Sequence, residues 1–260
     1  MHRGFNLTLN DVDLSGYQAI GKELHAADAN AVKVALDHFL GLDGVIDGSS
    51  LQELWFPQVR SDVFISHSHA NEEMALGLAG CLKQEFGLKP FIDSCVWGYV
   101  NDLQRQIDRK YCLNPDKANY DYDKRNGTTS HVHMMLSTAL TTMIDNTECL
   151  IFLNTPTSIT TRDSVSTTQS PWLYMELGIA RMIRQKTPDS HRELINLSES
   201  RGWKTASAQY KAKYKVDLTP LTPISKDTLE RWASELDLGE RYPLDCLYRI
   251  TPPTSQGEQA

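Results

Sequence analysis

The chain has 260 residues, a length that allows one large domain or one domain with substantial additions. Hydrophobic residues make up 40% of it and charged residues 23%, which is enough for a real core and excludes a wholly disordered chain. With 26 Lys and Arg against 33 Asp and Glu, the formal net charge is −7. A chain of this charge is a poor candidate for binding nucleic acid or an anionic membrane, so we expect neither as a partner.

The cysteines and the hydropathy pattern indicate the compartment. The five cysteines are widely spaced and none forms a CxxC pair, which argues against a disulfide framework and against a zinc ribbon. The first 16 residues carry Asp11 and Asp13 and lack the apolar stretch of a signal peptide. The densest apolar run, 149–153, is far shorter than the ~20 residues that cross a bilayer. We therefore expect a cytoplasmic protein in a reducing compartment.

Residues 1–60 are predicted to form a helical N-terminal extension. Apolar residues recur at steps of three and four between positions 17 and 39, as on one face of a helix. The sequence Ser-Leu-Gln-Glu from Ser50 is a capping box that predicts a second, short helix ending before Pro57.

A strand, a helix and a second strand follow. Residues 62–67 begin as a short apolar run, and 90–93 form another. Between them, Asn71 is placed to cap a helix that Gly87 ends. This spacing predicts a βαβ unit with parallel strands.

The next predicted strand is 149–153, which is apolar throughout, as strands buried on both faces of a parallel sheet are. A polar insertion at 111–130 and an amphipathic helix from Val132 precede it. After it, Ser170 as N-cap and Pro171 at the first helical position mark the start of a helix over 171–185.

The signal is weaker in the C-terminal part of the chain. Residues 193–197 are a predicted fourth strand, 229–236 a helix and 246–250 a fifth strand. We interpret 61–200 as the main domain and 201–260 as a C-terminal extension packing on it. The predicted fold class is α/β, a flavodoxin-like doubly wound parallel sheet of about five strands.

Polar residues follow each of the three best-defined strands. The ranges 66–69, 93–94 and 154–155 all lie at predicted carboxyl ends, where ligands collect in such sheets. The alternative is that polar loops simply begin there.

Glu176 is the most informative single residue. It lies one helical turn after Trp172 and on the same face as Ile179, where a carboxylate is costly unless it is paired or meets a cleft. Burial there would raise its pKa. The alternative is a boundary glutamate paired with Arg105 or Arg181.

Four segments together resemble the Toll/interleukin-1 receptor (TIR) family, most of all its bacterial members. The resemblance covers residues 61–200, and its most specific part is the Trp-x-x-x-Glu spacing of Trp172 and Glu176. The segments are Asp62-Val63-Phe64-Ile65-Ser66-His67-Ser68, Phe91-Ile92-Asp93, Leu150-Ile151-Phe152-Leu153 and Ser170-Pro171-Trp172-Leu173-Tyr174-Met175-Glu176.

The resemblance implies an NAD-consuming enzyme that cleaves the nicotinamide–ribose bond, with Glu176 as the catalytic residue. Such a reaction passes through an oxocarbenium-like state that a carboxylate stabilises, and nicotinamide leaves as a neutral molecule. NAD is then a substrate, and neither a cofactor nor a metal is implied. The expected substrate-binding residues are Trp172, Phe64, Ser66, His67, Ser68, Asp93 and Trp97, the last stacking on a base.

The same resemblance implies biological partners. Bacterial TIR proteins act in antiphage defence, notably in Thoeris systems, where a product derived from ADP-ribose signals to a separate effector protein. We also expect self-association through TIR domains. The Arg-Asp-x-x-Pro-Gly stretch of animal receptor domains is absent, since Ser94 to Gly98 stand there, which weakens an adaptor analogy.

Three alternatives stay open. The chain could be a non-enzymatic TIR module that assembles through 93–97, or an enzyme like nucleoside deoxyribosyltransferases, which act on free nucleosides with a catalytic glutamate. The pairs His67-x-His69 and His131-x-His133 suggest a metal, but neither completes a known ligand pattern.

Overall fold

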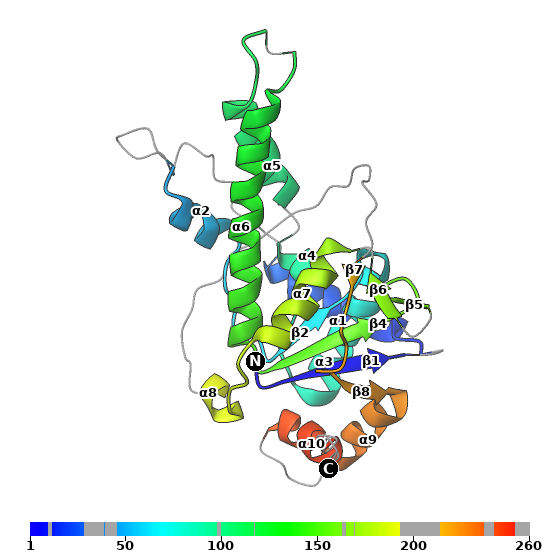
Figure 1. The fold of residues 1–260 in the computed structure, drawn as a ribbon. Helices are drawn as coiled ribbons and strands as arrows, with labels where there is room; N and C mark the ends of the chain where they lie inside the picture. The colour runs from blue at the N-terminus through cyan, green and yellow to red at the C-terminus, as the bar shows by residue number, and fades with distance from the viewer. Residues whose placement is uncertain are drawn as a thin grey trace.

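A parallel sheet of five strands forms the centre of the molecule, with helices on both faces (Figure 1). The predicted α/β class with a parallel sheet of about five strands is confirmed. The computed structural model describes residues 1–9, 12–28, 39, 46–97, 100–116, 118–162, 165–168, 170–192, 214–236 and 242–252. In spatial order the strands are β3 (Pro90–Phe91), β2 (Val63–Ser66), β4 (Cys149–Asn154), β1 (Arg3–Thr8) and β8 (Thr222–Ser225).

The N-terminal strand β1 lies inside this sheet and pairs in parallel with both β4 and β8. The expectation that 1–60 is only a helical extension is therefore wrong for residues 3–8. Phe5 and Leu7 are fully buried, but two apolar residues next to Arg3 and Asn6 are too short a pattern to identify a central strand. If the five strands of this sheet are numbered in chain order, so that β8 is the fifth, their spatial order is 3-2-4-1-5. The order in flavodoxin-like chains is 2-1-3-4-5, so the two arrangements differ in where the N-terminal strand lies.

The other predicted strands have different outcomes. Strands β2, β3 and β4 confirm the predictions at 62–67, 90–93 and 149–153. The range 193–197 lies outside the described residues. The range 246–250 is not a strand but part of helix α10 (Pro243–Ile250), because its buried side chains recur at helical spacing.

Alternate residues of β4 face two separate apolar cores. Leu150 and Phe152 belong to the first core, whereas Ile151 and Leu153 belong to the second. This alternation is what a strand buried on both faces requires. The first core is covered by α2 (Gly48–Trp55), α5 (Val100–Tyr111), α6 (Tyr122–Asn146) and α7 (Pro171–Met182), and the second by α3 (Glu72–Phe86), α9 (Lys226–Leu236) and α10, with α1 (Gln18–Asp28) packed against α3.

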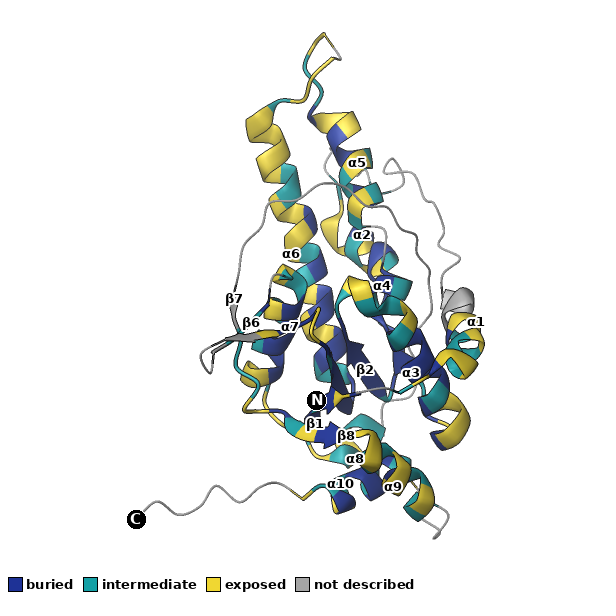
Figure 2. Cartoon of the chain, turned by 90° about the vertical axis from the view of Figure 1, so that its right-hand side faces the viewer, coloured by how far each residue is buried: buried dark blue, intermediate teal, exposed yellow. Residues whose placement is uncertain are grey.

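Helix α6 begins earlier than predicted. It takes in the second half of the expected insertion at 111–130, because the Asp121 carboxylate accepts a hydrogen bond from the Lys124 backbone N–H and caps the helix. The first half of α6 lies beside α5 and projects beyond the sheet (Figure 1). This projecting part is largely exposed (Figure 2).

Helix α2 also begins earlier, and with a different cap. Asp47 accepts hydrogen bonds from the backbone N–H groups of Ser49 and Ser50, so Ser50 is inside the helix and the predicted capping box is wrong.

The remaining described elements are η1 (Ser15–Tyr17), η3 (His69–Asn71), α4 (Asp93–Val96), α8 (Pro188–Arg192) and a small antiparallel sheet of β5 (Thr160–Arg162), β6 (Val165–Thr168) and β7 (Tyr214–Lys215).

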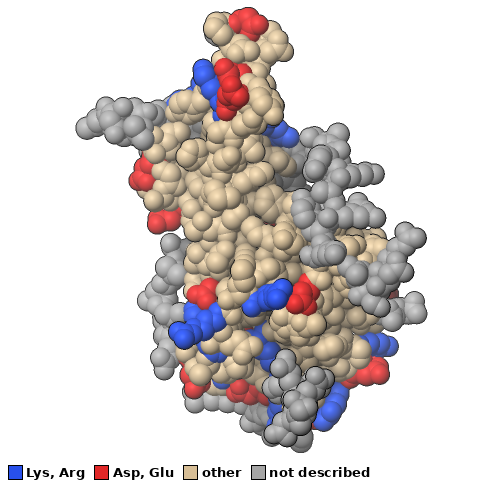
Figure 3. All heavy atoms as spheres, viewed as in Figure 1, with Lys and Arg blue, Asp and Glu red and all other residues tan. Residues whose placement is uncertain are grey.

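The described part of 201–260 belongs to the same core as the rest of the chain. Strand β8 pairs with β1, and the fully buried Trp232 of α9 stacks on Phe86 of α3 with ring centroids 3.8 Å apart. Among the described residues, none of the helices combines the length and the apolar character needed to cross a membrane. On the face shown in Figure 3, the described acidic and basic side chains are interspersed.

Gly87 ends α3 in the left-handed conformation, with φ of 67°. Gly87→Ala is expected to lower the free energy of unfolding by about 1–2 kcal/mol, because a Cβ disfavours this conformation. Gly127, in the exposed part of α6, is the control. Gly127→Ala should raise the free energy of unfolding by up to about 1 kcal/mol, because alanine favours the helix more than glycine does and nothing lies near the added Cβ. Urea unfolding measures the stability of both variants, and equal effects would contradict the left-handed conformation of Gly87.

Candidate active site at the carboxyl ends of the strands

The carboxyl ends of three neighbouring strands carry polar side chains at one edge of the sheet. Ser66 is the last residue of β2, Asp93 begins α4 two residues after β3, and Thr155 follows β4. Because β2, β3 and β4 are parallel, these ends meet on the same side, where ligands bind in open α/β sheets.

Helix α7 brings Glu176 to this edge. As predicted, Ser170 caps the helix by accepting a hydrogen bond from the Leu173 backbone N–H, and Pro171 occupies its first turn. Leu173 and Leu177 anchor the helix in the first core. Glu176 lies on the same buried face and is 2% exposed, so its carboxyl group points towards the sheet rather than into solvent.

Ser66 is the direct partner of Glu176. The Ser66 hydroxyl donates a hydrogen bond of 2.5 Å to Glu176 Oε2. The structure therefore brings together two predicted site residues that are 110 positions apart in the chain. It does not show the alternative ion pairs of Glu176 with Arg105 or Arg181, since those arginines bind Asp102 and Asp217.

The electrostatics of Glu176 are unusual for a glutamate. Burial raises its pKa well above 4.5, Asp93 raises it further, and the hydrogen bond from Ser66 lowers it. Among the described residues, no lysine, arginine or histidine forms an ion pair with Glu176. A buried carboxyl group without a cation would gain a counter-charge from a cationic ligand.

His67 and Ser94 form a second polar pair at this edge. His67 is 7% exposed, and its Nε2 lies 3.3 Å from the Ser94 hydroxyl. Burial lowers the pKa of His67 by more than the nearby Asp93 raises it. The net shift is downward from 6.5, so the imidazole is mainly neutral at pH 7. Ser94 lies in the range 93–94 that the sequence places at a strand end, but it is not among the expected substrate-binding residues.

Asn71 connects the loops after β2 and β4. Its side-chain amide donates to the hydroxyls of Thr155, at 2.6 Å, and Thr157, at 2.8 Å. Asn71 therefore holds the site together instead of capping α3 through its side chain as predicted. Ser68 is half-buried at the start of η3, where its carbonyl accepts from the Asn71 backbone N–H.

The predicted aromatic residues have structural positions. Trp97 is 3% exposed, and its indole N–H donates to the Pro57 carbonyl at 3.2 Å, so this buried ring is not free to stack on a base as expected. Phe64 is fully buried and packs against Phe91 in the first core. Trp172 is half-buried one turn before Glu176, and its ring lies edge-on to His133 of α6 at 5.7 Å.

The histidine pairs do not build a metal centre within the described residues. The rings of His67 and His69 are 6.4 Å apart between centroids, and no third ligand of the described chain joins them. The polar groups at this edge are therefore the carboxyl groups of Glu176 and Asp93, the imidazole of His67, and the hydroxyls of Ser66, Ser94 and Thr155.

Glu176 should leave a signature in the pH dependence of stability. Its folded pKa lies above its ordinary value of 4.5, so its contribution is most favourable below pH 4.5 and is lost as pH rises through the folded pKa. Glu176→Gln removes this loss. The stability of the variant relative to the natural chain should therefore rise with pH above 4.5, by at most about 1.4 kcal/mol per pH unit. Urea unfolding over a pH series tests this, and parallel profiles would refute it.

Comparisons of this chain with protein families, with curated proteins and with solved structures found no match.

Proposed function

We propose that this chain is a TIR-type NAD glycohydrolase that cleaves the bond between nicotinamide and ribose at the edge defined by Ser66, Asp93 and Glu176. The observation that carries the proposal is the buried Glu176 carboxyl group, held by Ser66 and lacking a described cationic partner. The nicotinamide ring of NAD is a cation, and it supplies the charge that this pair of carboxyl groups lacks.

The reaction needs one carboxylate. Binding of the pyridinium beside Glu176 and Asp93 favours the ionised form of Glu176. The C1′–N bond then breaks, its electron pair goes to the ring nitrogen, and neutral nicotinamide leaves. The ionised Glu176 stabilises the positive charge that develops on the ribose.

Water completes the cleavage. A water oxygen bonds to C1′ and its proton is released, so that NAD and water give ADP-ribose, nicotinamide and a proton. The neutral imidazole of His67, placed by Ser94, is a suitable acceptor for that proton at neutral pH. Attack by a group of the substrate itself instead of water would give a cyclic product.

The finer parts of the proposal rest on the resemblance to bacterial TIR proteins. They are a relationship to the flavodoxin-like fold, self-association, a cytoplasmic role in antiphage defence of the Thoeris type, and a separate effector that senses the product.

The test is incubation of the concentrated full chain with NAD, followed by mass identification of the products. We expect nicotinamide together with ADP-ribose or a compound derived from it. Parallel incubation with deoxynucleosides separates the alternatives, because a nucleoside deoxyribosyltransferase would exchange their bases and leave NAD intact. Assembly without loss of NAD or nucleosides at high protein concentration would support the non-enzymatic module and contradict the proposal.

A further inference from the structure

A cavity lies at the opposite edge of the sheet from Glu176, beside the amino ends of β1 and β8. Its volume is about 890 Å³, which falls in the range of small-molecule sites. Arg3 and His2 line it from the start of β1, and Leu221 and Thr222 from the start of β8. Ser66 marks the carboxyl end of β2, so the cavity is separate from the Glu176 site.

Arg3 is a buried cation without a described counter-charge. It is 9% exposed, and its guanidinium donates to the Thr222 hydroxyl, at 3.0 and 3.2 Å, and to the Tyr248 carbonyl, at 3.5 Å. It also lies 5.1 Å from the ring centroid of Phe5. All these partners are neutral, and no carboxylate of the described residues forms an ion pair with Arg3.

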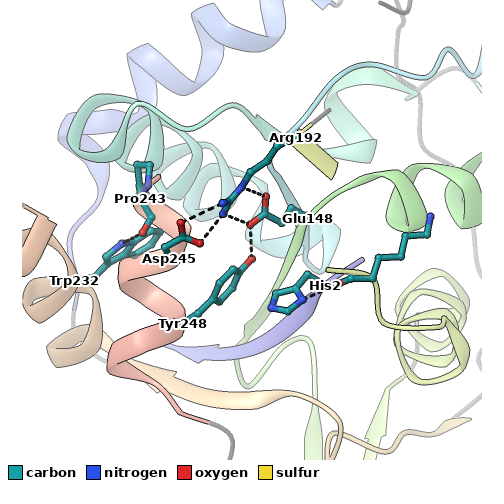
Figure 4. Close-up of polar contacts among 8 residues, drawn as sticks. His2, Glu148, Arg192, Trp232, Pro243, Asp245 and Tyr248 are labelled. Carbon is teal, nitrogen blue, oxygen red and sulfur yellow. Dashed lines mark hydrogen bonds and ion pairs between the residues drawn. The ribbon is translucent and has the colours of Figure 1, made fainter. Parts of the chain in front are cut away.

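The acids of the adjoining network are already engaged. Glu148 and Asp245 both bind Arg192, and Tyr248 donates to Glu148 while its ring lies edge-on to His2 (Figure 4). Burying a cation that lacks a carboxylate is costly, and an anion bound beside it would offset that cost. Burial accordingly lowers the pKa of Arg3.

The rest of the wall defines the ligand further. Asn6 Oδ1 is buried without a hydrogen-bond partner in the described structure. Because Asn6 lines the cavity, an N–H or O–H group of a bound ligand would satisfy this acceptor. Gln185 adds a neutral amide, and Leu218 and Pro223 add apolar surface. The volume is much larger than an inorganic anion needs.

We propose that this cavity binds an organic anion of about mononucleotide size, whose phosphate or carboxylate group pairs with Arg3. The inference rests on the Arg3 cavity and is independent of the proposed NAD chemistry.

Calorimetric titration of the full chain at constant ionic strength tests the proposal, with AMP and citrate as organic anions, inorganic phosphate as the small anion and adenosine as the uncharged probe. We expect AMP, citrate or both to bind, and adenosine to bind at least about tenfold more weakly than AMP if AMP is the ligand. Binding of AMP alone assigns a phosphate ligand, and binding of citrate alone assigns a carboxylate. Equal binding of inorganic phosphate would overturn the size class.

Variants locate the binding. Arg3→Gln should weaken anion binding at least about tenfold. Gln185→Glu should also weaken anion binding at least about tenfold, because it places a negative charge on the wall of the cavity. Since Gln185 is exposed, this variant should fold, and it tests the location of the anion if Arg3→Gln does not fold. Arg109→Gln, an equal charge change on the projecting α5, should bind as the natural chain does, and so should Glu176→Gln, which excludes binding at the other site. Failure of every anion to bind at millimolar concentration, or binding that survives both cavity variants, would overturn the proposal.

Discussion

Replacing Glu176 with glutamine is expected to lower nicotinamide release from NAD at least about 100-fold, because the variant cannot stabilise the positive charge that develops on the ribose. Glutamine keeps the shape of the side chain and can still accept a hydrogen bond from Ser66, so the chain should fold. Far-ultraviolet circular dichroism and urea unfolding verify the fold, and chromatographic measurement of nicotinamide gives the rate.

The matched control is Glu53→Gln, which makes the same chemical change at an exposed position of α2. It should leave the rate unchanged. Ser66→Ala should lower the rate less than Glu176→Gln does, because it removes a positioning hydrogen bond and keeps the carboxyl group. A folded Glu176→Gln variant with full activity would remove Glu176 from the mechanism.

Arg192→Ala is expected to lower the free energy of unfolding by about 3–5 kcal/mol, the usual cost of leaving a buried charge without its partner. Arg192 binds Glu148 through two hydrogen bonds, of 2.9 and 3.0 Å, and Asp245 through two more, of 2.8 and 3.1 Å (Figure 4). The side chains of Arg192 and Glu148 are only 15% and 6% exposed. The network thus joins α8, α10 and the residue before β4.

The pH dependence separates this explanation from simple loss of packing. Burial already raises the pKa of Glu148, and without Arg192 it should rise further. The variant then binds more protons folded than unfolded, so its stability falls as pH rises from 4.5 through the folded pKa, and its deficit should shrink in acid. Arg181→Ala, which breaks an exposed pair with Asp217, should cost less than about 1 kcal/mol. A deficit independent of pH would contradict the role of charge.

Much of the candidate site could be predicted from local pattern. Ser170 and Pro171 mark the start of α7, and the helical period places Glu176 on its buried face. The apolar runs before Ser66 and Asp93 predict strands that end at one edge. These are statements about neighbouring residues, for which sequence carries the information.

Trp97 and Ser94 show where that information stops. Both follow Asp93, and sequence alone favours the aromatic ring as the ligand contact. The structure buries Trp97 against Phe91 and Pro57, whereas Ser94 meets His67. Which side chain of a short loop enters the core depends on the volume left by distant elements, and no local period reports it.

The sequence by itself determined the parallel α/β class, the strands β2 and β4, and the capped helix that carries Glu176, because apolar runs and caps are encoded within a few adjacent residues. Only the tertiary structure decided that β1 enters the sheet between β4 and β8, and that Ser66 meets Glu176. The physical reason is that strand pairing and side-chain hydrogen bonds join groups up to more than a hundred residues apart, whose partners are selected by the packing of the whole chain.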